Sequence, residues 1–288
     1  MDIGRLIDDN LVDLAALDGP ESWVLPVSHL AHPRMRSRPA RCVTEDPAEM
    51  VFTATFDRPH PVGAIAICAH TLEMDATWRA VGYAGEIGGE MVYDTGDLPA
   101  FPAWHASVDL PWSHPSLWSG RPTARDIGGY TPHLLHVLPQ AATAAAWSFS
   151  FGNPTGPGWF DLGYLMIGSA LSPAWGFAWS RERSADWRDL VDRSAGGAPL
   201  AQEMRPARLQ NVTWQHLTEA EARRLHDAMI RRRGVHPVFL VPDSRATLDL
   251  SRDCWPGLLR SPPRMRMAQT GDDGIEWSVT VELEELVA

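Results

Sequence analysis

The stretch FTATFDRPHPVGAIAICAHTLEMDATWRAVGYAGEIGGEMVYDTG, residues 52–96, decides the fold class. Residues 52–57 alternate between apolar and polar side chains, which predicts a strand with one buried face. Residues 62–69 form a continuous apolar run, residues 78–83 alternate again, and residues 91–93 follow the turn signal Gly88-Gly89. We therefore expect a meander of short antiparallel strands.

The composition favours a folded protein that is mainly β. With 288 residues, of which 44% are hydrophobic, the chain can bury the core of one large or two ordinary domains. Its 24 prolines and 23 glycines are spread throughout, which argues against long helices and favours short strands joined by loops.

The pattern of elements predicts three parts. Residues 1–21 are expected to form an N-terminal arm whose apolar side chains suit docking on some other surface. Residues 22–172 are expected to form a β-sandwich, because residues 143–151 place Trp147, Phe149 and Phe151 in alternation with serines and residues 163–170 supply another apolar strand. Residues 173–288 are expected to form a smaller α+β domain.

The α+β prediction rests on one helix and the strands around it. Residues 217–234 predict a helix that begins with a capping box of Thr218 and Glu221, places Leu225 and Met229 on one face, and ends at Gly234. Strands are predicted over residues 205–214, 235–242 and 276–286.

Charge and targeting signals exclude several classes of protein. The formal net charge of −11 opposes binding to a nucleic-acid backbone. No apolar run reaches the roughly 20 residues of a membrane span, and the aspartates of residues 1–19 do not fit a signal peptide, so we expect a protein made in the cytoplasm. The three widely spaced cysteines suggest neither disulfides nor a zinc site.

The histidines are candidates for metal ligands or catalytic groups. His133 and His136 lie in an extended segment, which points them to opposite faces, and we expect no metal and no cofactor. A loop with His70 could form an acid/base site, although such a loop is usually solvated. The carboxylates that would act with His70 in such a site are Glu73 and Asp75. Two further histidines, His29 and His32, are expected at the surface.

Enzyme signatures are absent from the sequence. We find no phosphate-binding loop, nucleophile elbow, zinc-protease motif or dinucleotide fingerprint after a strand. A glycosidase needs only two carboxylates placed by the fold, so a cell-wall hydrolase stays open as a third hypothesis, but acidic loops on a sandwich explain these residues better. We therefore predict no enzymatic activity and no catalytic residues; the carboxylates concerned are Glu86, Glu90, Asp94 and Asp97.

The best binding candidate is the loop FPAWHASVDLPWSHPSLW, residues 101–118. Trp104, Trp112 and Trp118 lie among prolines that stiffen the loop, and their faces suit either a sugar or a protein partner. The alternative is that they fold back as a small satellite core. A basic segment, with Arg34, Arg36, Arg38 and Arg41, is expected to be a solvated loop or an interface with an acidic neighbour.

The order of these segments resembles two known groups of proteins. Residues 22–172 are similar to the galactose-binding-like, discoidin-type jelly roll, on the segments RSRPARCVTED, FTATFDRPHPVGAIAIC, WRAVGYA and AAWSFSFGNPTGPGWFDLGYLMIG. The whole chain resembles minor structural proteins in the tail tip of long-tailed bacteriophages, prophages and gene transfer agents. The segments that carry this resemblance are PVSHLAHPRMRSR, AHTL with WR, YDTG, GYLMIG, LTEAEARRLHDAMIRRRG, VFLVPD and WSVTVELEEL.

The resemblance implies a distal tail or baseplate protein of the virion, assembled in the host cytoplasm. Its jelly roll would face outward and its C-terminal part would be similar to the tail-tube barrel. The expected partners are further copies in a ring and the tail tube, hub and fibre proteins. The alternative is a carbohydrate-binding module that contacts host surface glycans through the three tryptophans.

Overall fold

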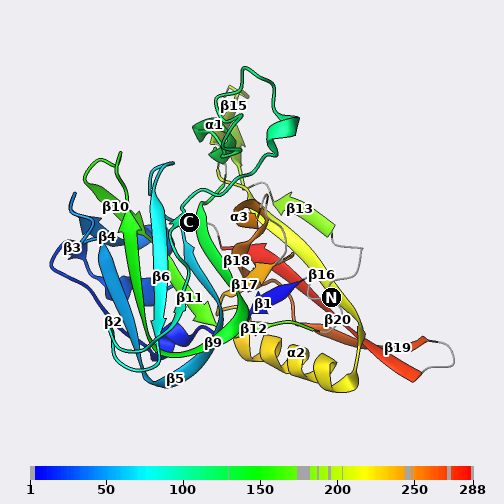
Figure 1. Cartoon of the computed structure of the whole chain (residues 1–288). Helices are drawn as coiled ribbons and strands as arrows, with labels where there is room; N and C mark the ends of the chain where they lie inside the picture. Colours follow the sequence, from blue (N-terminus) through cyan, green and yellow to red (C-terminus); the bar gives the residue numbers. More distant parts are fainter. Residues whose placement is uncertain are drawn as a thin grey trace.

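The computed structural model describes residues 4–128, 130–173, 182–186, 188–193, 196–202, 204–243, 248, 250–270 and 274–286. The protein is mainly β and is built from antiparallel sheets, as the sequence predicts. Figure 1 shows a sandwich of strands on one side and, beside it, a second sheet with one long helix beneath it. Among the described residues, no helix is both long and apolar enough to cross a bilayer.

The first unit consists of a seven-stranded sheet covered on one face by a three-stranded sheet. In the larger sheet the strands lie in the order β11 (Tyr164–Gly168), β5 (Val51–Cys68), β9 (His133–Gly152), β6 (Thr77–Tyr83) and β7 (Met91–Asp94), with β2 (Ala16–Asp18) on β5 and β8 (Leu98–Pro99) on β6. The smaller sheet has the order β10 (Trp159–Leu162), β4 (Ala40–Val43) and β3 (Trp23–Leu25).

The core between these two sheets is rich in aromatic side chains. Phe52 stacks on Phe149 with ring centroids 4.6 Å apart. Trp23 from the smaller sheet meets Phe52 and Phe160 edge-on at 5.6 and 5.7 Å. Because these side chains come from alternate positions of their strands, the period-two pattern of the sequence is what places them in one layer.

The predicted meander is wrong in one respect, since β5 and β6 are not neighbours. Strand β9 lies between them and pairs with β5 from Val51 to Cys68. The segment between β5 and β6, residues 69–76, is too long for a tight hairpin and leaves room for a strand between them. The β6–β7 hairpin is confirmed.

Strand β5 also joins two segments that the sequence suggests are separate. Its register against β9 shifts at two bulges, between Thr55 and His60, where Pro59 lies, and between Val62 and Ala64, while Pro61 pairs with Thr143. Beyond the bulges β5 is buried on both faces: Ile65 and Ile67 enter the sandwich core, whereas Ala64 and Ala66 face the second unit.

The second unit is an eight-stranded sheet with the helix α2 (Glu219–Arg232) packed on it. Its strands lie in the order β12 (Ala170–Leu171), β1 (Arg5–Ile7), β17 (Val238–Val241), β18 (Trp255–Leu259), β20 (Gly274–Glu285), β16 (Ala207–Leu217) and β13 (Glu182–Asp186), with β19 (Arg264–Thr270) on β20. Among the described strands this sheet ends at β12 and β13, so it does not close into the barrel that the resemblance to tail-tube proteins implies.

The predicted helix is confirmed in detail. Thr218 accepts a hydrogen bond from the Glu221 backbone, while the Glu221 side chain accepts from the Thr218 backbone N–H at 3.0 Å. Leu225 and Met229 are buried against the sheet. The helix ends at Arg232, and the C-cap residue Arg233 adopts φ 52°, a left-handed conformation, directly before Gly234 at φ 71°.

The N-terminal segment connects both units. Strand β1 pairs with β12 and β17 of the second sheet, and β2 pairs with β5 of the first. Between them the buried Asn10 side chain donates to the Leu165 carbonyl (2.9 Å) and to the Tyr164 hydroxyl (3.0 Å), and accepts from the Ile167 N–H at 3.0 Å. The division into residues 1–21, 22–172 and 173–288 stays a prediction.

The remaining elements are a separate two-stranded hairpin and short helical turns. The hairpin is β14 (Leu190–Arg193) with β15 (Pro199–Gln202). The turns are η1 (Leu11–Leu14), η2 (Val27–Ala31), η3 (Met35–Ser37), η4 (Ser107–Asp109), α1 (Ala124–Ile127) and α3 (Leu250–Asp253).

Candidate functional site

The tryptophan loop is closed at its neck by backbone hydrogen bonds. The N–H groups of Trp104 and His105 both donate to the Gly120 carbonyl, at 2.8 and 3.0 Å. Gly120 has φ +62°, and a Cβ there would lie 2.3 Å from the His105 carbonyl oxygen, so only glycine fits this close approach. The segment between these residues projects from the molecule, as Figure 1 shows above the label α1.

The structure separates the three predicted tryptophans. Trp104 is 8% exposed and lies edge-on to Tyr130 at 5.6 Å, so it belongs to the base of the loop. Trp112 and Trp118 are 83% and 82% exposed and meet each other edge-on at 5.8 Å. Two members of the predicted set therefore share the tip of the loop, and the third fixes its base.

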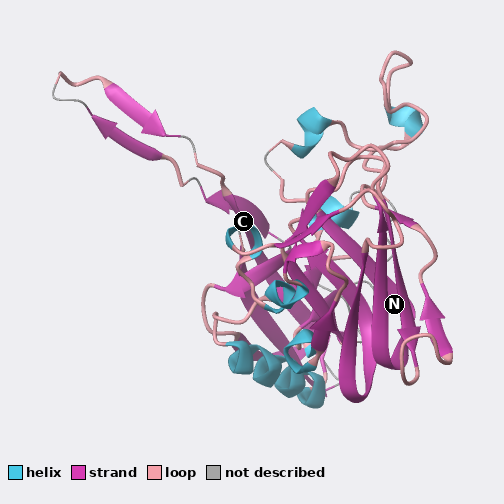
Figure 2. Ribbon diagram, turned by 90° about the vertical axis from the view of Figure 1, so that its left-hand side faces the viewer, coloured by secondary structure: helices cyan, strands magenta, loops and turns pink. Residues whose placement is uncertain are grey.

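A second projecting segment, the hairpin β14–β15, was not predicted. Figure 2 shows it extending away from the sheets as a pair of strands. Its base is held by an ion pair of Arg188 with Glu284 and by a hydrogen bond from the Met204 N–H to Asp189 at 2.8 Å. The signal that could have revealed it is the pair Gly196-Gly197 between two short apolar segments.

The hairpin exposes apolar side chains on both of its faces. Leu190, Val191 and Leu200 are 59%, 68% and 59% exposed. Val191 pairs with Ala201 on one face, while Leu190 and Leu200 lie on the other. Because an isolated two-stranded hairpin is at best marginally stable in water, these side chains are suited to contact with another surface.

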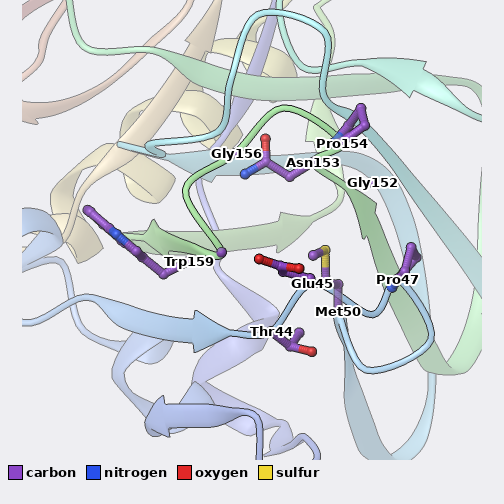
Figure 3. Close-up of a pocket in the computed structure, with 10 residues that line it drawn as sticks. Thr44, Glu45, Pro47, Met50, Gly152, Asn153, Pro154, Gly156 and Trp159 are labelled. Carbon is purple, nitrogen blue, oxygen red and sulfur yellow. The ribbon is translucent and has the colours of Figure 1, made fainter.

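A pocket of about 350 Å³ lies at one end of the sandwich, between the loops β4–β5 and β9–β10. Figure 3 shows Glu45 and Met50 near its middle and the Trp159 indole at one edge, extending away from Glu45. Asn153 accepts a hydrogen bond from the Glu73 N–H at 3.0 Å, which fixes the upper loop. The lining thus combines amide, carboxylate and aromatic groups.

Trp159 is held in place by a neighbouring arginine. Arg41 lies over the indole at 4.6 Å and forms a two-point salt bridge with Asp161, at 2.7 and 2.8 Å. That salt bridge raises the pKa of Arg41. Arg41 is therefore a structural partner of Trp159 and separate from the exposed Arg34 and Arg38, while the side chain of Arg36 lies outside the described residues.

The four carboxylates named for glycoside hydrolysis lie on β7 or in the loops beside it. Asp94 accepts a hydrogen bond from Arg79 at 2.8 Å, and this bond holds the pKa of Asp94 below its usual value. Glu86, Glu90 and Asp97 are exposed in the loops around β7.

His70 is not a solvated loop residue. It is 2% exposed and lies edge-on to Phe101 at 5.1 Å, and burial lowers its pKa to about 3. Its companions Glu73 and Asp75 are not buried with it, and Asp75 accepts a hydrogen bond from Thr155 at 2.6 Å. The acid/base site considered for this loop is therefore not assembled.

The two histidines of β9 lie in a strand, as predicted. His133 is buried, and burial lowers its pKa well below the usual value. His136 is three residues further along the strand, so its side chain points to the opposite face from that of His133. It makes a 2.7 Å hydrogen bond with the Tyr93 hydroxyl. Within the part of the chain that the structure describes, no group of three or more His, Cys, Asp or Glu side chains could hold a metal ion.

Comparison with known proteins identifies no family. No protein-family model matches the chain, and no curated protein matches it. Among solved structures, the chain is similar to CBM32-1 from a family 31 glycoside hydrolase from Clostridium perfringens, with a TM-score of 0.35 and 7% sequence identity. The match covers 54% of this chain and 94% of that one, and a likeness this weak does not assign a fold family or a function.

Proposed function

We propose that this protein is a non-enzymatic structural component of a phage tail tip, a distal tail or baseplate protein. It would assemble into a homo-oligomeric ring and connect the tail tube to hub or fibre proteins. In this proposal the sandwich is a galactose-binding-like jelly roll, and the eight-stranded sheet with α2 is the tube-like part. The protein would be assembled in the host cytoplasm and reside in the virion, without a cofactor.

The observation that supports this proposal most is the hairpin β14–β15. It leaves the body of the protein with apolar side chains on both faces and no third strand beside it among the described residues. Such a segment loses apolar exposure only when another surface covers it. A ring supplies that surface, because each copy presents its hairpin to the next copy.

The exposed tip of the tryptophan loop supports a further contact. Trp112 and Trp118 present large aromatic faces on a loop whose neck is fixed by Gly120. Aromatic side chains of this kind dominate the energetics of protein interfaces. In the proposed assembly the hairpin joins copies, and this tip contacts hub or fibre proteins.

The test removes apolar surface from the hairpin and measures assembly. The variant Val191→Ser with Leu200→Ser should convert the oligomer to a monomer in sedimentation equilibrium. The matched control is Leu14→Ser with Val24→Ser, the same residue types at 60% and 59% exposure elsewhere, and it should keep the native mass. A native chain that stays monomeric at all concentrations and is absent from purified virions would refute the proposal.

A second candidate function is glycan binding at the pocket beside Trp159. It is supported by the mixture of an indole, a carboxylate and an amide around about 350 Å³ at the end of the sandwich. Retention on immobilised host polysaccharide would be measured for Trp159→Ala and for Trp112→Ala with Trp118→Ala. Loss in the first variant alone would place a sugar in the pocket, and no retention of the native protein would end this candidate.

A further inference from the structure

A groove of about 440 Å³ lies where the C-terminal end of α2 meets the connection between β18 and β19. One wall carries Ile230 of α2, which is 49% exposed, and the other carries the exposed Pro262. Met229 and Leu259 also line the groove. It therefore offers apolar surface to a partner, at a place separate from the tryptophan tip and the Trp159 pocket.

A close backbone approach fixes the two walls of the groove to one another. A Cβ at Gly234 would lie 2.6 Å from the Leu259 carbonyl oxygen, and Gly234 has φ +71°, so only glycine fits there. On the opposite wall the Arg260 N–H donates to the Glu282 carbonyl of β20 at 2.9 Å. Because the backbone of both walls is held in this way, the groove is preformed for a partner.

The charged side chains that line this groove are arginines. Arg233 and Arg260 are exposed, and neither takes part in an ion pair among the residues that the structure describes. The described lining contains no Asp or Glu, although the whole chain has a formal net charge of −11. The groove therefore matches a partner that presents a carboxylate beside apolar side chains.

One face of the hairpin β14–β15 has this combination of side chains. Asp192 pairs with Leu200 across the hairpin, and Leu190 lies two residues before Asp192, so these three side chains share a face. All three are exposed, and Asp192 accepts a hydrogen bond only from the Arg193 N–H, at 2.7 Å, among the described groups. We call this the carboxylate face of the hairpin; the Arg193 side chain lies on the opposite face.

The hairpin and the groove lie at opposite ends of the molecule. Figure 1 shows β15 near the top and α2 at the bottom, and Figure 2 shows the hairpin and the long helix at the same two levels. A contact between them therefore requires two copies of the chain. Because the two surfaces differ, the contact is head-to-tail, and such contacts form a ring when the rotation between copies closes.

We infer that the groove receives the carboxylate face of the hairpin from a neighbouring copy. Leu190 and Leu200 of one copy lie against the apolar walls of the next, which removes apolar surface of both copies from water. Asp192 pairs with the arginines of the groove. This inference rests on the proposed ring, and it names the surface that accepts the hairpin.

Disulfide trapping tests the contact directly, because the three native cysteines are buried. Full-length Leu200→Cys is mixed with a tagged Ile230→Cys chain under mild oxidation, and mass spectrometry should find a disulfide that links one chain of each kind. The control replaces Ile230→Cys by Val24→Cys, at a site that is 59% exposed on β3, and should link about tenfold less. Equal linkage in the two mixtures would overturn the inference.

Charge reversal tests the pairing of Asp192 with the groove. Asp192→Arg, and separately Arg233→Asp with Arg260→Asp, should each weaken self-association about tenfold in sedimentation equilibrium. All three substitutions in one chain should restore association, because the opposite charges then face each other again. The control Arg193→Asp changes the other face of the hairpin and should associate as the native protein does.

The outcomes separate this inference from the proposed ring. A native chain that stays monomeric at all concentrations would refute both. If the native chain assembles and Leu200→Ser weakens assembly, while Arg233→Asp with Arg260→Asp assembles as the native protein does, the ring stands and the groove is not its acceptor. Failure of the triple substitution to restore association would also contradict the assigned pairing.

Discussion

The pairs β5–β9 and β14–β15 are both antiparallel ladders, but they differ in what their side chains contact. In β5–β9, alternate residues such as Phe52 and Phe149 are buried in the sandwich core. In β14–β15, every side chain that the structure describes is exposed, including Leu200. The same antiparallel pairing therefore buries apolar side chains in the core in one place and leaves them in solvent in the other.

Substitutions in the core between β5 and β9 should have the largest effect on stability. Phe149→Ala removes an aromatic ring that stacks on Phe52, and we expect it to lower the free energy of unfolding by about 3–5 kcal/mol. Urea unfolding measures this loss. If the variant does not fold, Phe149→Leu should still unfold reversibly with a loss of about 1–2 kcal/mol. If each variant lost less free energy of unfolding than the range given for it, the assignment of Phe149 to the core would be contradicted.

The buried Asn10 should give the next largest effect. Asn10→Ala leaves the Leu165 carbonyl and the Ile167 N–H unpaired, and we expect a loss of about 2–4 kcal/mol in urea unfolding. The control is Asn211→Ala, since Asn211 is exposed and bonds to Glu182 at 3.3 Å. An equal effect of the two substitutions would refute the role of Asn10 in joining the two units.

The buried His70 should make stability depend on pH. Its pKa is about 3 in the folded state against 6.5 unfolded, so between these values the unfolded chain binds more protons and stability falls as the pH is lowered. The slope per histidine reaches about 1.4 kcal/mol per pH unit. The stability of His70→Leu should therefore fall less steeply than that of the native protein as the pH is lowered below 6.5. Thermal unfolding across a series of pH values measures this.

The control for this pH dependence is the exposed His32. His32→Asn should keep the native acid profile, because its side chain is in solvent in both states. Since His133 is also buried with a lowered pKa, His70→Leu should reduce the acid sensitivity without abolishing it. An unchanged profile in His70→Leu would show that this ring is accessible to protons in the folded protein.

The smallest effect on stability is expected in the hairpin. Leu200→Ser should change the free energy of unfolding of the dilute, unassembled chain by less than about 0.5 kcal/mol, because its side chain is already in water. Urea unfolding at low protein concentration measures this. A loss comparable to that of Phe149→Ala would mean that the hairpin packs on its own chain.

Short sequence patterns predicted those helices and strands whose formation depends on residues close together in the sequence. The capping box of Thr218 and Glu221 predicted where α2 begins, and the alternation of residues 276–286 predicted the strand β20. The order of strands could not be predicted in this way. The insertion of β9 between β5 and β6 depends on contacts between distant residues, for which residues 52–96 carry no signal.

The burial of β5 on both faces has a signal in the sequence. The change from alternation in residues 52–57 to a continuous apolar run in residues 62–69 marks the point where β5 becomes buried on its second face. The Trp loop shows the opposite case. Trp104, Trp112 and Trp118 have similar surroundings in the sequence, and only the closure of the neck at Gly120 separates the buried ring from the exposed ones.

The position of β1 has a consequence for synthesis of the chain. This strand is synthesised long before its partner β17, which lies at residues 238–241. Leu6 and Ile7 must therefore wait in an incomplete intermediate until most of the polypeptide has emerged. Fragments that lack β1 or β17 would expose an unpaired, aggregation-prone sheet edge. The two halves of the chain should therefore be soluble when co-expressed and precipitate when expressed separately.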